Sequence, residues 1–501
     1  MKPWILWALF ILYSVAMVVV SIIKTGREKD GDEYWNAKKD LAWWQLAISL
    51  TAGWLMLGWI GFGMGQIYML GATGLWILPI PWLVLCVLLV FLVPLYRKVP
   101  FYSIADAFQK RFGANARVLI GFFSLGVFLC WTGAELFMVK KLVGQNMALP
   151  ANTEWLLLFL FVLPIMIYTY WGGFRAVVFT DVCQFCIMVA FMIILLAFAL
   201  HYTSGVAGGK SLLEAVRASR PPWLAEGKSV FGFWNMGLIF PIALFLGYLP
   251  GWLIEQDLWQ RLQAAKSTGD ARKTAWGGLF LIATFVIVIP SVVGFLSLVA
   301  FPPEAGKEAM AVGGEGQMAV GIIPAFIAKM PSLLAYLMFL GVLACQMSTV
   351  DTFANVSAMA LANDILGKKG QAGLRVGKIM SVVVLFLAFL YAVIADKLGD
   401  VYYISSGVLS ASIAVPLIAY GWKRMSAAAV FAASTAGALS AIGFYLLEYK
   451  VWKLTAPASL SLLSNSIGYN YLGACVLTSA LVLVVMTILV PNKARAWASR
   501  E

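Results

Sequence analysis

Polar side chains crowd residues 345–366, CQMSTVDTFANVSAMALANDIL, directly after the unbroken apolar run LLAYLMFLGVLA. Ser348, Asp351, Thr352 and Asn355 follow the i, i+3, i+4, i+7 rule, so a helix would carry them on one face. A carboxylate without a partner in hydrocarbon costs several kcal/mol. Since hard cations prefer a cage of oxygen ligands, the stripe predicts a cation site.

A second acid extends this prediction. In the segment GGFRAVVFTDVCQF, Asp181 lies about a turn and a half inside a predicted span over 176–200. Asp181 and Asp351 would either hold a second cation or share a proton. The alternative is that the hydroxyls bond back to their own helix and that the acids are solvated near helix ends.

Composition determines the elements that position these residues. Hydrophobic residues make up 62% of the 501-residue chain and charged residues 12%, and the mean hydropathy is +0.88. A large soluble core does not explain so many long runs without polar faces, so we expect an all-α polytopic membrane protein in the lipid bilayer. The net charge of +13 is scattered over short loops instead of forming one patch, which argues against nucleic acid as a partner.

Apolar runs between charged segments predict about thirteen transmembrane helices. The expected spans are 4–23, 46–70, 75–96, 117–139, 155–170, 176–200, 236–256, 275–300, 332–363, 376–396, 402–421, 427–446 and 471–490. With the N-terminus outside and the C-terminus cytoplasmic, about two thirds of the 36 Lys and Arg residues fall on the cytoplasmic side. We therefore expect a multi-pass protein of the plasma (inner) membrane in that orientation.

No nucleotide or enzyme signature accompanies these spans. The segment GGKSLLEAVRAS resembles a phosphate-binding loop, but Ser204 stands where that motif requires glycine. The polar groups form no nucleophile–base set, so an enzyme is not expected. Without a nucleotide, an ion gradient would have to drive any pumping.

Two spans carry residues that interrupt helices. The span 46–70 contains five glycines in ISLTAGWLMLGWIGFGMG, and the span 236–256 contains Gly247, Pro250 and Gly251. A break at Pro250 is expected because proline removes a backbone donor, although glycine-rich spans also serve as close-packing surfaces. Each of these two spans is the first of five consecutive predicted spans, over 46–200 and 236–421. Two such five-span blocks predict an inverted repeat with broken helices. The single transporter domain (1–501) would add a span at 4–23 and two at 427–490.

With these segments assembled, the chain resembles the sodium:solute symporter family, whose fold is of the leucine-transporter type. The matching segments, in family order over roughly residues 40–425, are GWLMLGWIGFGMGQIYMLGATGLW, WGGFRAVVFTDVCQ, EQDLWQRLQAAKS, CQMSTVDTFANVSAMALANDIL and YGWKRMS. The resemblance implies sodium-driven symport of a small organic solute into the cell by alternating access, with Na⁺ as the coupling ion. A proton-coupled carrier of the same fold is the alternative, and no obligatory protein partner is evident.

The resemblance also implies site residues. One sodium site would use the hydroxyls of Ser348 and Thr349 with the backbone carbonyls of Cys345, Ile48 and Thr51. A second, present in some members, would use Asp181, Asp351 and Thr352. Proline-type carriers have an acid in the second span where Leu50 stands here, so their coupling is not carried over.

From the position of the cargo in the family, the resemblance implies that the cargo-binding residues are Gly53, Trp54, Glu135, Tyr248 and Trp252. The sequence does not identify the cargo itself. Glu135 is an acid inside a predicted span and is therefore a site candidate on its own. It would receive a cationic group of the cargo, or else pair with Lys140, Lys141 or external water.

Overall fold

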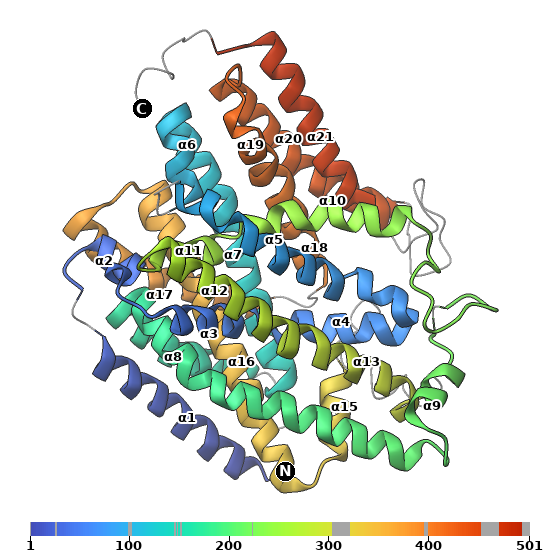
Figure 1. Cartoon of the computed structure of the whole chain (residues 1–501). Coiled ribbons are helices and arrows are strands. Elements are labelled where there is room, and N and C mark those ends of the chain that lie inside the picture. Colours follow the sequence, from blue (N-terminus) through green and yellow to red (C-terminus); the bar gives the residue numbers. More distant parts are fainter. Residues whose placement is uncertain are drawn as a thin grey trace.

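The computed structural model describes residues 2–25, 28–98, 103–144, 147, 149–150, 153–222, 224–302, 321–394, 399–451 and 470–492. Regular structure in these ranges is helical throughout (Figure 1). The α-helices are α1 (Pro3–Lys24), α2 (Gly31–Asn36), α3 (Trp43–Trp54), α4 (Leu57–Leu70), α5 (Pro79–Lys98), α6 (Ile104–Phe112), α7 (Ala114–Leu142), α8 (Glu154–Val206), α9 (Leu212–Ala218), α10 (Ile239–Leu253), α11 (Gln256–Ala264), α12 (Thr268–Leu281), α13 (Ile289–Ala300), α15 (Ile322–Lys329), α16 (Ser332–Met359), α17 (Gly370–Ile394), α18 (Gly399–Val408), α19 (Val415–Ile418), α20 (Ala427–Leu446) and α21 (Asn470–Leu489).

The expected all-α polytopic fold is confirmed, but the number of thirteen spans is not. Ten helices of the described chain are long and apolar enough to cross a membrane, or up to eleven when α10 and α11 count as one bent span. Part of the difference lies in α8 (Glu154–Val206), whose two helical segments, separated by a kink at Gly173, lie over the predicted spans 155–170 and 176–200. The division into a 4–23 span, two repeats and a 427–490 pair stays a prediction.

Gly173 forms a kink that separates two helical segments of α8. Its φ of 51° and ψ of −139° are non-helical, and a Cβ there would lie 2.6 Å from atoms of Tyr34. Only glycine adopts this conformation against so close a neighbour without strain. The kink redirects the second half of α8, which carries Asp181.

Both expected helix breaks are present. α3 ends at Trp54 and α4 begins at Leu57, so Leu55 and Met56 are not helical. α10 and α11 are bent by 41° across Ile254 and Glu255. The expected position at Pro250 is wrong, because Pro250 lies inside α10 and the chain leaves the helix four residues later. Next to the proline, the Gly251 amide bonds the Ser410 hydroxyl at 3.1 Å, so the backbone pairing is already altered there.

The broken helices are part of a helical bundle (Figure 1), and polar residues such as Ser348, Asp351 and Asp181 are buried inside it. α16 packs against α3, α7, α8 and α17, and α1 packs against the outer side of α8. Large apolar side chains are exposed on the outer helices, among them Leu12, Phe91, Phe122, Leu439 and Leu481. An exposed apolar exterior around a core with buried acids suits a protein surrounded by lipid.

Candidate ion and cargo sites

Asp181 is the point at which three helices meet. Its Oδ1 accepts a hydrogen bond of 2.5 Å from the Ser348 hydroxyl of α16, and its Oδ2 accepts one of 2.5 Å from the Ser49 hydroxyl of α3. All three side chains are fully buried. The carboxylate of α8 therefore ties the helix before the first break to the polar stripe of α16.

Arg261 of α11 supplies a positive charge to this cluster. Its Nη2 lies 3.5 Å from Asp181 Oδ2 and donates at 2.9 Å to the Thr352 hydroxyl, and its Nε donates at 3.0 Å to Ser49. Its Nη1 lies 3.9 Å from Asp257 Oδ2, and the side chain is only 1% exposed. A guanidinium with several donors in fixed directions suits such a buried set of acceptors.

The residues expected at the first sodium site lie on the two sides of the α3–α16 contact, Ile48 and Thr51 on α3 before its break and Cys345, Ser348 and Thr349 on α16. Thr51 Oγ1 and Thr349 Oγ1 donate to the carbonyls of Ala47 and Cys345, at 2.9 Å and 3.0 Å, so both hydroxyls bond back to their own helix. Because α3 ends at Trp54, its last carbonyls lose their regular partners. The Leu55 amide bonds Ala52 instead of Thr51, which leaves the Thr51 carbonyl available to a ligand.

Asp351 has a different environment from Asp181. Its Oδ2 accepts from the hydroxyls of Tyr168, at 2.5 Å, and Thr180, at 3.4 Å. Its Oδ1 is buried and accepts no hydrogen bond within the part of the chain that the structure describes. The Thr352 hydroxyl, by contrast, already contacts Arg261. A buried carboxylate oxygen without a donor is a place where a cation would lower the energy.

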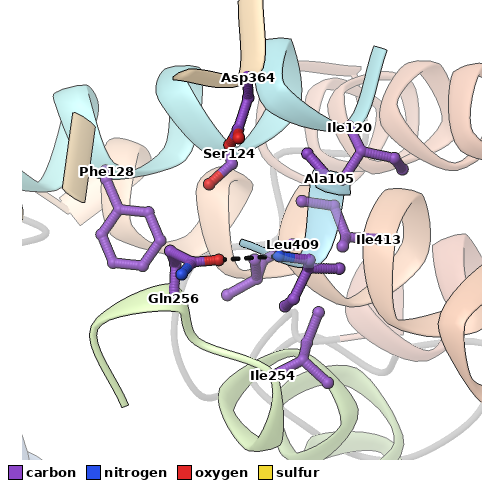
Figure 2. A pocket seen from close by; sticks show the side chains of 10 residues that line it. Ala105, Ile120, Ser124, Phe128, Ile254, Gln256, Asp364, Leu409 and Ile413 are labelled. Atoms are coloured by element: carbon purple, nitrogen blue, oxygen red, sulfur yellow. Dashed lines mark hydrogen bonds between the residues drawn. The ribbon is translucent and has the colours of Figure 1, made fainter. Parts of the chain in front are cut away.

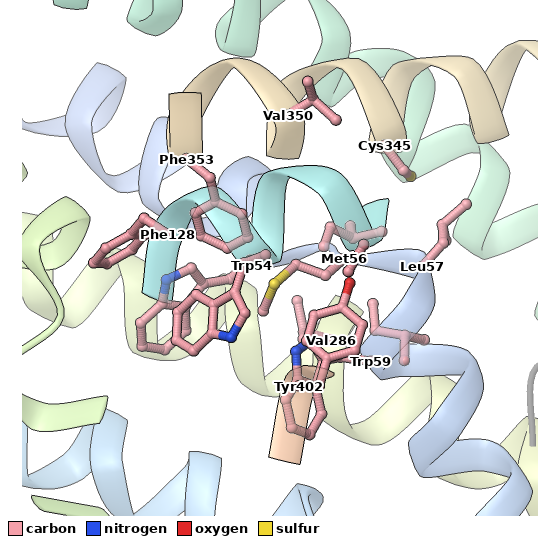
Figure 3. Packing of buried hydrophobic residues seen from close by; sticks show 14 of the residues in the cluster. Trp54, Met56, Leu57, Trp59, Phe128, Val286, Cys345, Val350, Phe353 and Tyr402 are labelled. Atoms are coloured by element: carbon pink, nitrogen blue, oxygen red, sulfur yellow. The ribbon is translucent and has the colours of Figure 1, made fainter. Parts of the chain in front are cut away.

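Trp54, Tyr248 and Trp252 of the expected cargo residues belong to an aromatic cluster near the two breaks, of which Figure 3 shows Trp54 with Trp59 and Tyr402. Tyr248 and Trp252 stack at 4.6 Å with an interplanar angle of 4°, and Trp54 stacks on Trp82 at 6.0 Å. Trp54 also donates through Nε1 to Asp257 at 2.9 Å. Gly53 faces the ion cluster instead: a Cβ there would lie 3.1 Å from Thr352 Oγ1 and 3.3 Å from Arg261 Nη2.

Glu135 of α7 is fully buried beside this aromatic cluster. Its Oε1 accepts a 2.5 Å hydrogen bond from the Tyr402 hydroxyl of α18. The alternative pairing with Lys140 is not formed, because Lys140 Nζ lies 3.1 Å from Glu154. Lys141 Nζ lies 5.5 Å from the centre of the Phe137 ring, and it forms no ion pair with Glu135 in the described chain.

A separate small pocket adjoins the α10–α11 break (Figure 2). Its polar members are Ser124, Gln256 and Asp364, and Gln256 Oε1 accepts a 3.1 Å hydrogen bond from the Ile104 amide. Ser103 donates to Asp364 at 2.6 Å. None of the residues expected from the sequence lines this pocket.

Sequence reasoning missed Arg261, Ser49, Trp59, Trp82 and Tyr402. The predicted span 236–256 ends before Arg261, whereas all of Gln256–Ala264 is buried. One signal was present: Asp257 and Arg261 are spaced i, i+4, which places opposite charges together on a short helix. Nothing in the local sequence indicates that Tyr402 reaches Glu135, since the two residues are 267 positions apart.

The chain was compared with known proteins. The profile of the Sodium:solute symporter family matches residues 34–437. A sodium/glucose cotransporter of Vibrio parahaemolyticus is 26% identical over 81% of this chain and 78% of its own length. The sodium/sialic acid symporter NanT of Aliivibrio fischeri is 23% identical over 74% of this chain and 72% of its own. A solved structure of a substrate-bound, outward-open Na⁺-coupled sialic acid symporter covers 98% of this chain and 99% of its own, with a TM-score of 0.72 and 17% identity, which shows a shared fold.

Proposed function

Since this chain belongs to the sodium:solute symporter family and is a sodium-driven symporter of a solute, we propose where its coupling ion and cargo bind. The Na⁺ site lies between α3 and α16. Its proposed ligands are the hydroxyls of Ser348 and Thr349 and the carbonyls of Cys345, Ile48 and Thr51. Transport of a small organic solute into the cell would follow by alternating access around this point.

The break of α3 is the observation that carries this proposal. It frees the Thr51 carbonyl at membrane depth, opposite a helix that presents Ser348 and Thr349. Both hydroxyls keep acceptor lone pairs while donating to Asp181 and Cys345. Hydroxyl and carbonyl oxygens together make the all-oxygen shell that a hard cation prefers.

For a second cation we propose Asp351 as the determining group, within the candidate set Asp181, Asp351 and Thr352. Asp181 and Thr352 both contact Arg261, so a fixed positive charge already stands beside them. Asp351 has one buried oxygen without a donor and forms no ion pair in the described chain. A second Na⁺ would therefore depend mainly on the charge of Asp351.

We propose the cargo site among Gly53, Trp54, Glu135, Tyr248 and Trp252. These residues come from the two broken helices and from α7, and the ring stacks lie beside the breaks.

We propose in addition that the N-terminus lies outside and the C-terminus in the cytoplasm, which the distribution of Lys and Arg supports. The sodium gradient suffices for accumulation: one charge crossing about 100 mV gains roughly 2.3 kcal/mol, which supports on the order of fifty-fold concentration.

The Ser348→Ala, Thr349→Ala double variant tests the Na⁺ site. We expect the Na⁺ concentration for half-maximal binding to rise about tenfold or more, because two of the proposed oxygen ligands are removed. The measurement is thermal stabilisation of the purified protein over a Na⁺ titration, with K⁺ at constant ionic strength.

Ser357→Ala is the matched control. It removes a buried hydroxyl from the same helix, away from the proposed ligands, and is expected to leave the Na⁺ titration unchanged. An unchanged Na⁺ titration in the double variant would contradict the proposed site. A titration altered equally in both variants would contradict it too, since the effect would then belong to the helix as a whole.

A further inference from the structure

Glu135 is a buried acid that has no counterion among the described residues. Tyr402 donates to Oε1, and the Gly58 backbone amide and the Gln346 side chain also lie against the carboxylate, while Oε2 is buried and accepts no hydrogen bond of good geometry in the described part of the chain. The ion pairs found among the described residues do not include Glu135, and Lys140, which the sequence offers as a partner, is paired with Glu154. A carboxylate at this depth requires either a proton or a cation from outside the protein.

Aromatic rings lie next to this carboxylate. Tyr402 joins the two, because its hydroxyl bonds Glu135 and its ring lies 4.9 Å from the ring of Trp59. Trp59 in turn contacts Trp252 and Tyr248 edge-on, at 6.0 Å and 6.3 Å. The negative faces of such rings attract cations, and cages of them bind quaternary ammonium groups.

The backbone after the first break lies against the same carboxylate. A Cβ at Gly58 would lie 2.9 Å from Glu135 Oε1 and 3.0 Å from the Tyr402 hydroxyl. The first turn of α4 therefore rests directly against the carboxylate, with no side chain between them. A group bound to Glu135 would contact the broken helix whose preceding carbonyls are proposed to hold Na⁺.

We propose that the cargo of this symporter carries a positively charged nitrogen, an ammonium group bound by Glu135 and the ring faces of Trp59, Tyr402 and Trp252. This inference rests on the proposed cargo site and names the class of its ligand. A neutral sugar can stack on the same rings, but it brings no positive charge, so Glu135 would have to bind that cargo in its protonated form. An anionic cargo would meet repulsion from Glu135.

Paired ligands that differ only in charge test the inference. Choline and its neutral carbon isostere 3,3-dimethylbutan-1-ol have nearly the same shape, and glucose serves as a neutral polyol. We expect choline to stabilise the purified protein against heat in Na⁺ but not in K⁺, and to bind at least tenfold more tightly than its isostere. Equal binding of choline and the isostere, preference for glucose, or no binding of choline in Na⁺ would overturn the ammonium inference.

Glu135→Gln separates the carboxylate from a general effect on the fold. We expect at least a tenfold loss of choline binding and an unchanged Na⁺ titration in this variant. Glu226→Gln, which removes an exposed carboxylate that is in no ion pair of the described chain, is expected to change neither. Retained choline binding in Glu135→Gln would overturn the role of Glu135. If Na⁺ does not stabilise the unmutated protein against heat, the proposed Na⁺ site is overturned instead. Failure of the proposed function is therefore distinguishable from failure of the ammonium inference.

Discussion

Replacing Arg261 with methionine is expected to lower the thermal stability of the purified protein more than any other single change of a charged residue proposed here. Methionine keeps much of the volume but removes the cation that stands between Asp181 and Asp257. Both carboxylates are fully buried. Removing one partner of a buried ion pair typically costs about 3–5 kcal/mol, because the remaining charge stays desolvated.

Arg175→Met is the matched control. Arg175 also pairs with two acids, but the closer pair, with Asp40 at 2.9 Å, reaches solvent through a side chain that is 50% exposed, while the contact with Glu28, whose side chain is 4% exposed, is a longer 3.7 Å. Pairs that reach solvent contribute about 0–1 kcal/mol, so we expect a much smaller loss. The measurement is the midpoint of thermal unfolding in detergent, followed by tryptophan fluorescence.

Two further variants sharpen the test. Arg261→Lys keeps the charge but loses the directed contacts to Ser49 and Thr352, and should fall between the wild type and Arg261→Met. Adding Asp181→Asn to Arg261→Met should restore part of the lost stability, since one uncompensated charge is then gone. Equal midpoints for Arg261→Met and Arg175→Met would show that the Asp181 cluster does not depend on the guanidinium.

The helical membrane architecture could be predicted from the sequence because its signals are local. Long apolar runs determine the spans, and the polar stripe of α16 was identified from the spacing of Ser348, Asp351 and Thr352 alone. The two breaks were predicted from glycine and proline. The second lies past Pro250, because where a helix ends depends on contacts such as that of Gly251 with Ser410.

The partners of the buried charges could not be predicted, because they depend on contacts between distant segments. Arg261 is 80 positions from Asp181, and the charged segment around it has the composition of a loop. In the sequence Asp181 and Asp351 are equivalent intramembrane acids. Their partners differ only in the folded protein, where Arg261 contacts Asp181 while the hydroxyls of Tyr168 and Thr180 donate to Asp351.

This difference leads to the second large effect, on the number of ions moved with each solute molecule. We expect Asp351→Asn to lower the ratio of charge to cargo flux, because the charge on which a second Na⁺ depends is removed. We expect Asp181→Asn to leave that ratio unchanged. It should instead raise the Na⁺ concentration for half-maximal uptake, since Asp181 orients the Ser348 hydroxyl at 2.5 Å.

The measurement is electrogenic uptake into proteoliposomes, with current and labelled cargo recorded together at fixed voltage. Asparagine keeps the size and hydrogen bonding of both side chains, so a changed ratio reports the charge. A ratio unchanged in Asp351→Asn would exclude a second ion at that residue. A ratio lowered only by Asp181→Asn would show that Na⁺ displaces Arg261 from Asp181 during transport. If the ratio in Asp351→Asn stays constant while its dependence on pH disappears, the carboxylate carries a proton and not a second Na⁺.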